Sequence, residues 1–210
     1  SVTGMGSDAF DVANHLFRRM KGGLGIGTVG ANAIFAAITG ISIASAAVFT
    51  RIAVPEMIKH GYTKRFSVGV VAGSSVLGML IPPSLLLILY CLLTEQSVGD
   101  LFIAGIIPGL LLAIVFATGI FLMAIFWPNF IGKDIDSESV KLATIAPSEL
   151  LAKGMPIFIL ISMVIGGIYG GFFTPIEAGA VGCAGAILIG VLRKKLTIKD
   201  FWQVLGDTGL

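Results

Sequence analysis

Charged side chains are scarce in this sequence of 210 residues: Asp, Glu, Lys and Arg make up 12% of it, against about 25% in soluble domains. So few ionised groups cannot cover a water-facing surface. With 56% hydrophobic residues and a mean hydropathy of +0.98, the composition excludes both a soluble globular domain and a disordered chain. The net charge of +2 is too small for a nucleic-acid-binding surface. The composition therefore predicts an integral membrane protein.

Cysteine and histidine are also scarce. Cys91 and Cys183 each lie alone in an apolar run, which gives no support to a disulfide framework or a CxxC metal site, and His15 and His60 belong to no metal-binding motif. Because no Ser/His, di-Asp or metal constellation is present, an intramembrane enzyme is disfavoured and no cofactor is expected. The chain shows no signal-peptide pattern at its start and stops abruptly, so we expect a fragment of a longer protein.

All fourteen basic residues fall into four clusters that are separated by apolar runs. The clusters are Arg18, Arg19 and Lys21; Arg51, Lys59, Lys64 and Arg65; Lys133, Lys141 and Lys153; and Arg193, Lys194, Lys195 and Lys199. The links 94–100 and 173–177 contain no basic residue, so each pair of spans returns the chain to its starting side. The positive-inside rule then places the last three clusters in the cytoplasm.

This charge pattern predicts an all-α polytopic membrane protein. The later segments are predicted as a transmembrane helix (101–130), a cytoplasmic loop (131–153), a transmembrane helix with an outside turn (154–177) and a further transmembrane helix (178–195). Apolar residues at helical spacing mark the two flanks. We expect 1–21 to be an amphipathic segment on the cytoplasmic side and 196–210 to be an interfacial segment.

The first apolar run, Gly22–Thr50, has a basic cluster at each end, so a single crossing would place one cluster on the wrong side. A continuous helix over this run would be roughly 43 Å long, which exceeds the hydrocarbon core of ~30 Å. A polar, glycine-containing interruption at 38–45 divides the run into two legs of ~12 residues, each ~18 Å long. We therefore predict a re-entrant helical hairpin over 22–60 with its tip near the bilayer centre. The alternative is one long tilted span with a misplaced cluster.

A broken transmembrane helix is predicted over 61–100. Pro82 and Pro83 lack N–H donors, and the residue before a proline is pushed out of the helical conformation. We expect the helix to end around 77–78 and to restart at Pro82 or Pro83. Non-helical backbone at this depth is tolerated only where it is buried in protein or lines a wet cavity. A merely kinked packing helix is the alternative, but the matching depth of the hairpin tip favours a functional site.

The directions of these half-helices indicate the chemistry of the region. The first hairpin leg and the segment from Phe66 end near the bilayer centre with unpaired carbonyls, which suit Na⁺. The second leg and the restarted helix place free N–H groups there, which suit a carboxylate. Neutral oxygens nearby come from Thr39 and from the candidate substrate-binding residues Ser42, Ser45, Ser74, Ser75 and Ser84. Because 22–50 and 66–93 contain no Asp or Glu, sodium coupling is favoured over proton coupling.

Four stretches of the sequence resemble the large membrane (M) subunit of TRAP (tripartite ATP-independent periplasmic) transporters. These stretches are 22–57, with Ala36-Ala37-Ile38-Thr39-Gly40-Ile41-Ser42 at its centre; Gly78-Met79-Leu80-Ile81-Pro82-Pro83-Ser84; 101–109; and 167–178. They follow the family's order along nearly the whole chain. Ile41 departs from the pattern, because the family often has a small polar residue there, so any ligand from Ile41 must come from its backbone.

The resemblance implies an elevator-type secondary transporter with two inverted repeats, each with a hairpin and a broken helix, that imports organic acids on a sodium gradient. It implies two partners, a periplasmic substrate-binding protein and a small membrane subunit, and a place in the inner membrane of a bacterial or archaeal cell. The implied sodium site consists of Thr39, Ile41, Gly78, Ile81 and Pro83. The second hairpin would follow Leu210. A stand-alone sodium-coupled dicarboxylate or citrate-type carrier is the alternative, and a channel is a further one.

Overall fold

The structure, a computed structural model, describes residues 4–17, 19–132 and 147–193. All regular secondary structure in these ranges is helical, which confirms the predicted all-α class for this part of the chain. The helices are α1 (Met5–Phe17), α2 (Gly23–Thr39), α3 (Ser42–Lys59), α4 (Lys64–Ser75), α5 (Leu77–Leu80), α6 (Leu85–Thr94), α7 (Val98–Phe126), α8 (Pro128–Ile131), α9 (Pro147–Tyr169) and α10 (Pro175–Leu192). The predicted segment 196–210 and most of the predicted loop 131–153 lie outside the described residues.

Two of the described helices are long and apolar enough to cross a membrane. These are α7, with a mean hydropathy of 2.6, and the stretch Ser148–Tyr169 of α9, with a mean hydropathy of 2.0. A third candidate span consists of Lys64–Leu80 and Leu85–Thr94, which meet at a bend of 40°. Gly23–Thr39 and Glu177–Leu192 are shorter apolar helices. The predicted membrane class and the bent helix pair are therefore confirmed.

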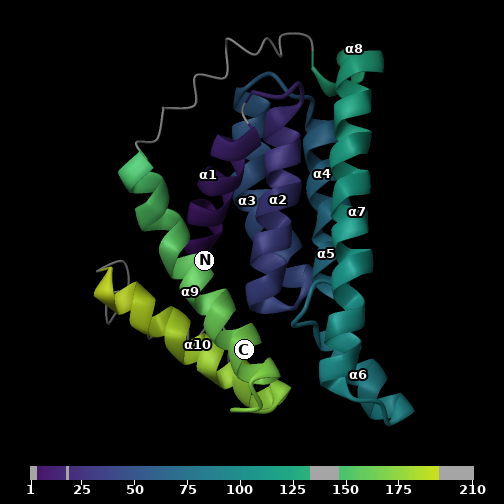
Figure 1. Ribbon diagram of the computed structural model, residues 1–210. Coiled ribbons are helices and arrows are strands. Elements are labelled where there is room, and N and C mark those ends of the chain that lie inside the picture. Colours follow the sequence, from purple (N-terminus) through teal and green to yellow (C-terminus); the bar gives the residue numbers. More distant parts are fainter. Residues whose placement is uncertain (1–3, 18, 133–146, 194–210) are drawn as a thin grey trace.

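Helices α2 and α3 form a helical hairpin whose turn consists of Gly40 and Ile41 (Figure 1). The helices have 17 and 18 residues, so the legs are about 26 and 27 Å long. They are longer than the predicted legs of ~18 Å, because the interruption is confined to two residues and α3 continues past the apolar run to Lys59. The apolar run, which ends at Thr50, therefore covers only the part of α3 nearest the turn.

The break in the second run lies a few residues later than predicted. Val76 keeps a right-handed helical conformation, so the chain continues from α4 into α5 and the helix ends at Leu80. The hydrogen bond from Ile81 N to Leu77 O is still formed, at 2.8 Å. Ile81, the residue before the first proline, is forced into an extended conformation (φ −74°, ψ 120°). The helix restarts at Leu85, because Ser84 is also extended.

An apolar core holds the hairpin against the broken helix. Its largest fully buried members include Leu24 of α2, Phe49 and Met57 of α3, and Leu77 of α5. Helix α1 crosses α2 and buries its own apolar face against this core, and α7 covers the opposite side (Figure 1). Helix α2 therefore packs between α1 and α7.

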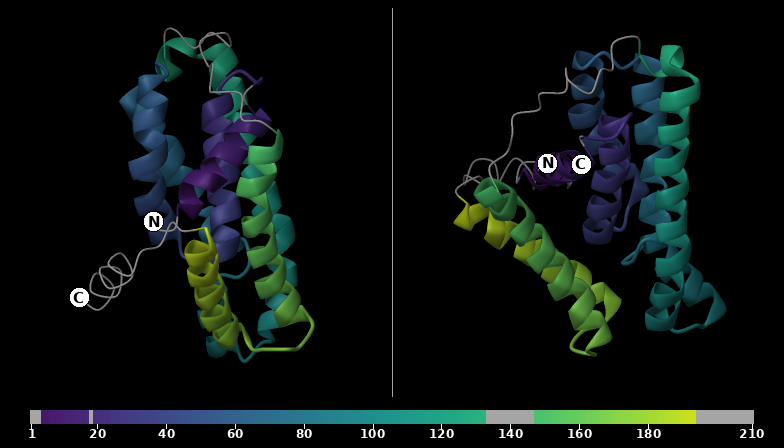
Figure 2. Two further views of the ribbon diagram at one scale, coloured as in Figure 1. Left: turned by 90° about the vertical axis from the view of Figure 1, so that its left-hand side faces the viewer. Right: turned by 45° about the horizontal axis from the view of Figure 1, so that its top comes forward.

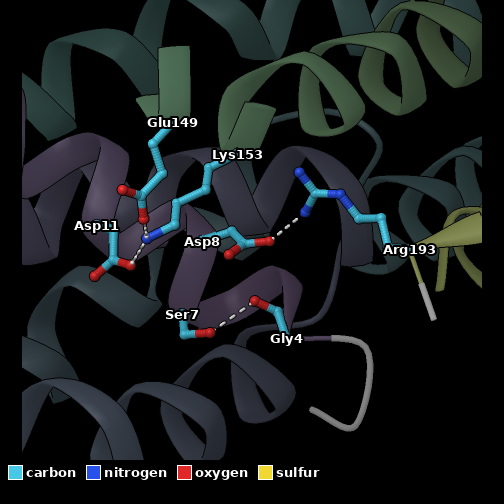
Figure 3. Close-up of polar contacts among 7 residues, drawn as sticks. All are labelled: Gly4, Ser7, Asp8, Asp11, Glu149, Lys153 and Arg193. Carbon is cyan, nitrogen blue, oxygen red and sulfur yellow. Dashed lines mark hydrogen bonds and ion pairs between the residues drawn. The ribbon is translucent and has the colours of Figure 1, made fainter. Parts of the chain in front are cut away.

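Helices α9 and α10 form a separate pair that diverges from the α2–α7 bundle (Figure 2). Helix α1 connects the two parts through ion pairs (Figure 3). Lys153 Nζ lies 2.8 Å from an Asp11 oxygen and 3.1 Å from a Glu149 oxygen, and Arg193 lies 2.5 Å from the buried Asp8 carboxylate. Helix α1 is therefore bound by apolar contacts on one side and by charge pairs on the other.

Candidate ion and substrate site

The tip of the α2–α3 hairpin contacts the break between α5 and α6 through its backbone. Gly40 adopts a left-handed conformation (φ 63°) that closes the turn, and its carbonyl accepts a hydrogen bond from Leu85 N at 3.1 Å. A Cβ at this position would lie 3.1 Å from the Pro83 carbonyl carbon and 3.3 Å from Ser84 Cα, and closer still to the Pro83 oxygen. Glycine is therefore required both by the conformation and by the close approach.

A second close approach links α5 to the start of α3. The buried Gly78 has so little space beside it that an added Cβ would lie 3.1 Å from Ser42 N and 3.3 Å from the carbonyl carbon of Ile41. On the other side of the break, α7 contributes two glycines, Gly105 and Gly109, which lie against the backbone of Leu80 and Ile81. These contacts hold the hairpin tip, the break and the middle part of α7 together.

The break leaves carbonyl oxygens without their usual helical donors. In a continuous helix, Gly78 O and Met79 O would accept hydrogen bonds from residues 82 and 83, but both of these are prolines and have no N–H. The Ser84 hydroxyl replaces one missing donor, at 2.8 Å from Met79 O. Among the described residues nothing donates to Gly78 O or to the last carbonyls of α2, from residue 37 to residue 39. Neutral acceptors therefore gather where the hairpin tip (residues 40–41) meets the break (residues 81–84), a region called the junction below.

The same junction contains two helix N-termini. The N-cap residues of α3 and α6, Ile41 and Ser84, form no side-chain capping bond. The first N–H groups of α3, from Ser42 to Ala44, have no acceptor among the described residues. Free N–H groups and the positive end of the helix dipole favour an anion at this position. The junction thus presents carbonyl groups at the C-terminal ends of α2 and α5, and N–H groups at the N-terminal ends of α3 and α6.

The structure places the five candidate serines differently. Ser45, Ser74, Ser75 and Ser84 are buried, and each donates its hydroxyl hydrogen inside the protein. Ser42 is half-buried at the start of α3, and its side chain forms no hydrogen bond with a described residue. Ser42 is therefore the one of the five whose hydroxyl group has no hydrogen-bond partner among the described residues.

The five residues of the implied sodium site lie at the two edges of the junction. Thr39 and Ile41 flank the turn residue Gly40, and Gly78, Ile81 and Pro83 belong to α5 and the break. The Thr39 hydroxyl donates to Phe35 O at 2.9 Å, so its oxygen keeps its acceptor capacity. The Ile41 carbonyl accepts a hydrogen bond from Ser45 N at 3.2 Å. The described residues include no group of three or more His, Cys, Asp or Glu that could hold a metal ion.

Sequence reasoning missed Asn32, the polar residue that links three helices behind the tip. The fully buried Asn32 side chain accepts a hydrogen bond from the Ser45 hydroxyl at 2.5 Å and donates to Ser74 Oγ at 2.6 Å. Ser74 in turn donates to Val70 O at 2.6 Å. The available signal was a lone Asn in an apolar run. This chain of hydrogen bonds holds α2, α3 and α4 together within about 11 Å of the tip along α2.

Comparisons with known proteins identify the family of the chain. The family model described as "Tripartite ATP-independent periplasmic transporter, DctM component" matches residues 1–210. The chain is 33% identical over 210 residues to the C4-dicarboxylate TRAP transporter large permease protein DctM of Pseudomonas aeruginosa, with 98% of this chain and 47% of the relative covered. It is 34% identical over 202 residues to the ectoine TRAP transporter large permease protein TeaC of Halomonas elongata, with 91% and 43% covered.

A third relative is the isethionate TRAP transporter permease protein DctMQ of Oleidesulfovibrio alaskensis, which is 33% identical over 203 residues, with 95% of this chain and 31% of the relative covered. The chain thus spans at most about half the length of these curated relatives. The family consists of membrane permeases and not of enzymes. On the match along its whole length, the chain belongs to the DctM component family of tripartite ATP-independent periplasmic transporters.

Proposed function

We propose that this chain is about half of the large membrane subunit of a sodium-coupled transporter that imports organic acids. The observation that carries the proposal is the backbone junction between the hairpin tip and the break, where unpaired carbonyls and free helix N-termini meet. Family membership supports transport by a tripartite system over the stand-alone dicarboxylate or citrate-type carrier. The relatives named for C4-dicarboxylate, isethionate and ectoine support a small organic substrate.

Sodium is the coupling ion that the chemistry of the junction favours. A hard cation such as Na⁺ prefers oxygen ligands, and carbonyls at the ends of broken helices coordinate it in transporters of this general design. Thr39 and Ile41 would contribute from the hairpin, and Gly78, Ile81 and Pro83 from the break. A proton would need a titratable group, and 22–50 and 66–93 contain no Asp or Glu.

The substrate carboxylate would bind at the N-terminus of α3. The free N–H groups of Ser42, Ile43 and Ala44 point out of the first turn of this helix, and the Ser42 hydroxyl adds a further donor. The N-terminus of α6 lies beside it, because Leu85 N bonds to the hairpin tip. Ser45, Ser74, Ser75 and Ser84 would support this region by their internal hydrogen bonds.

The unit that moves in the proposed elevator mechanism would include α2 to α7. The close contacts of Gly40, Gly78, Gly105 and Gly109 bind the hairpin, the break and α7 to one another, so the site would travel with them as one body. A second, inverted repeat would come from the part of the protein beyond this chain. A periplasmic substrate-binding protein would deliver the substrate and a small membrane subunit would complete the complex, in the inner membrane of a bacterial or archaeal cell.

Uptake by the full-length permease, reconstituted in liposomes with its small subunit and binding protein, tests the proposal. Gly78→Leu would push the larger side chain against Ser42 N, which an added Cβ already approaches to 3.1 Å. We expect sodium-driven uptake to fall at least about tenfold, since 1.4 kcal/mol of lost ion binding has this effect. Gly179→Leu is the control, because an added Cβ there meets nothing within 4 Å.

Three results would overturn the proposal in different ways. Unchanged sodium dependence in the Gly78 variant would remove the ion site from the junction. Saturable uptake by the permease without a binding protein would favour the stand-alone carrier. Non-saturating flux that is independent of the sodium gradient would indicate a channel.

A further inference from the structure

An apolar groove of about 390 Å³ lies between α4 and α7, away from the junction. Its walls include Phe66 and Val70 of α4 and Phe116 and Ile120 of α7. Three glycines keep it open: an added Cβ would meet nothing within 4 Å at Gly69 or Gly119, and only the Phe116 ring, at 3.4 Å, at Gly73. The groove is therefore a built concavity, whose open space depends on residues without side chains.

One end of the groove carries a positive charge. Arg65 is the charged residue that lines it, and this exposed side chain forms no ion pair or hydrogen bond with any residue that the structure describes. Lys64 precedes it at the first position of α4. The same end of α7 carries Trp127, which is 63% exposed. Basic and exposed aromatic residues at one end of a membrane helix are typical of the headgroup region.

The backbone fixes this end of the groove firmly. Thr63 N donates to Ile131 O at 2.6 Å, and the Thr63 hydroxyl donates to Phe130 O at 2.7 Å. These two bonds tie the start of α4 to α8, directly after the end of α7 (Figure 1). Arg65 therefore lies in the first turn of a helix whose start is hydrogen-bonded to α8, and these bonds fix its position beside the groove.

The length of the groove matches one leaflet of a bilayer. From Arg65 to Gly73 the helix rises about 12 Å, against ~15 Å for half of the hydrocarbon core. We propose that the α4–α7 groove binds one acyl chain of an anionic phospholipid of the cytoplasmic leaflet, with the lipid phosphate paired to Arg65. Basic pockets between membrane helices on the cytoplasmic side recognise such headgroups.

Charge and size favour a lipid over a helix from the remainder of the protein. A helix is about 10 Å across and would cover the groove instead of entering it, and an apolar helix would supply no counter-charge for Arg65. An acyl chain fits between the two glycine-lined walls, and its phosphate supplies the missing negative charge.

Photo-crosslinking of the purified full-length permease tests this proposal independently of transport. The probes are phosphatidylglycerol and phosphatidylcholine that carry a diazirine in one acyl chain, and the labelled peptides are identified by mass spectrometry. We expect label on peptides containing 66–73 and 115–123, with a preference of about fivefold for phosphatidylglycerol, which is the effect of one basic residue near the surface.

Three variants separate the acyl chain from the headgroup. Gly119→Leu fills the groove and should reduce labelling by both lipids at least about fivefold, and Gly69→Leu provides the same test from the facing wall. Arg65→Gln should abolish the preference for phosphatidylglycerol and retain labelling. The matched controls are Gly166→Leu, at another glycine with open space, and Lys64→Gln, whose side chain does not line the groove. Gly166→Leu should label like the unmodified protein, and Lys64→Gln should retain a preference for phosphatidylglycerol that Arg65→Gln loses.

Three outcomes would overturn the proposal. The first is labelling that persists in both glycine variants, and the second is a phosphatidylglycerol preference that survives Arg65→Gln. The third comes from benzoylphenylalanine placed at Val115: a cross-link to another segment of the protein, in place of a lipid, would show that the groove is filled by polypeptide. Size-exclusion chromatography of each variant verifies that the protein remains folded.

Discussion

Replacing Gly40 by Ala tests whether the contact between the hairpin tip and the break creates the ion site. Gly40 has φ 63°, a conformation that costs a residue with a side chain about 1–2 kcal/mol. The added methyl group would also press on the Pro83 carbonyl, where the nearest carbon lies only 3.1 Å away. To relieve this contact the tip must move away from the break, which breaks the hydrogen bond from Leu85 N to Gly40 O, worth about 1 kcal/mol.

Gly171 provides a matched control for the backbone strain. It adopts almost the same conformation (φ 69°), but an added Cβ there would meet nothing within 4 Å. Ala at either position therefore carries the same strain of about 1–2 kcal/mol, and only Gly40→Ala loses the junction contact. The difference in sodium dependence between the two variants therefore measures the effect of that contact alone.

Sodium dependence of uptake by the reconstituted full-length transporter is the deciding measurement. A loss of about 1.4 kcal/mol of sodium-binding free energy at the junction would raise the sodium concentration for half-maximal uptake about tenfold in Gly40→Ala. Gly171→Ala should leave this concentration unchanged. Thermal unfolding in detergent provides the stability of both variants. Equal sodium dependence in the two variants, with Gly40→Ala still folded, would refute the reasoning.

Four further predictions concern stability in the full-length protein. Asn32→Ala removes the acceptor of the buried Ser45 hydroxyl and the donor to Ser74 Oγ, and should lower stability by about 1–3 kcal/mol. Asn14→Ala removes a buried amide with no hydrogen-bond partner in the described structure and should cost less; equal losses would contradict the role of the Asn32 network. A double-mutant cycle with Asp11→Ala and Lys153→Ala should show a coupling of about 1 kcal/mol between α1 and α9, since the pair is partly exposed; zero coupling would mean that the pair does not hold these helices. Burial raises the pKa of the Tyr62 hydroxyl to about 12. The stability that depends on a neutral Tyr62 hydroxyl is therefore complete below pH ~10 and is lost as the pH rises to ~12. Tyr62→Phe has no hydroxyl to ionise and should lose less stability over this window. Na⁺, in contrast to choline, should raise the melting temperature, with about 2.7 kcal/mol of stabilisation at 100 times its Kd; an equal effect of both cations would count against a sodium site.

The sequence predicts best those features that depend on the backbone chemistry of single residues. Gly40 in a polar interruption and the consecutive prolines 82 and 83 locate the turn and the break correctly to within a few residues. The end of the helix at Leu80 could not be predicted, because a proline acts on the residue before it and leaves earlier hydrogen bonds intact. The local interruption is therefore shorter than the composition of the region indicates.

The roles of the polar side chains were much less predictable. The Asn32 network joins residues up to 42 positions apart, and such pairings depend on how three helices pack. The internal bonds of Ser74 and Ser75 follow a local tendency, since a helical serine donates to a carbonyl three or four residues earlier. Ser42 forms no such bond, because it is the first residue of α3 and has no preceding helical turn.

The low charge of the sequence and the chemistry of the junction have a common physical cause. An unpaired carbonyl inside a membrane protein costs about 1–3 kcal/mol, so several of them together would consume a large part of a stability of about 5–15 kcal/mol. A cation that binds these carbonyls offsets this cost and brings a charge that the protein itself lacks. Carboxylates at the same place would bind the cation more strongly, but they would remain as buried charges whenever the ion leaves. Backbone carbonyls from a glycine-closed tip and a proline-broken helix are neutral in the empty state. In the proposed mechanism, a junction of this composition would release a cation and still cross a medium of low dielectric constant without carrying a charge, which an alternating-access cycle requires in both directions.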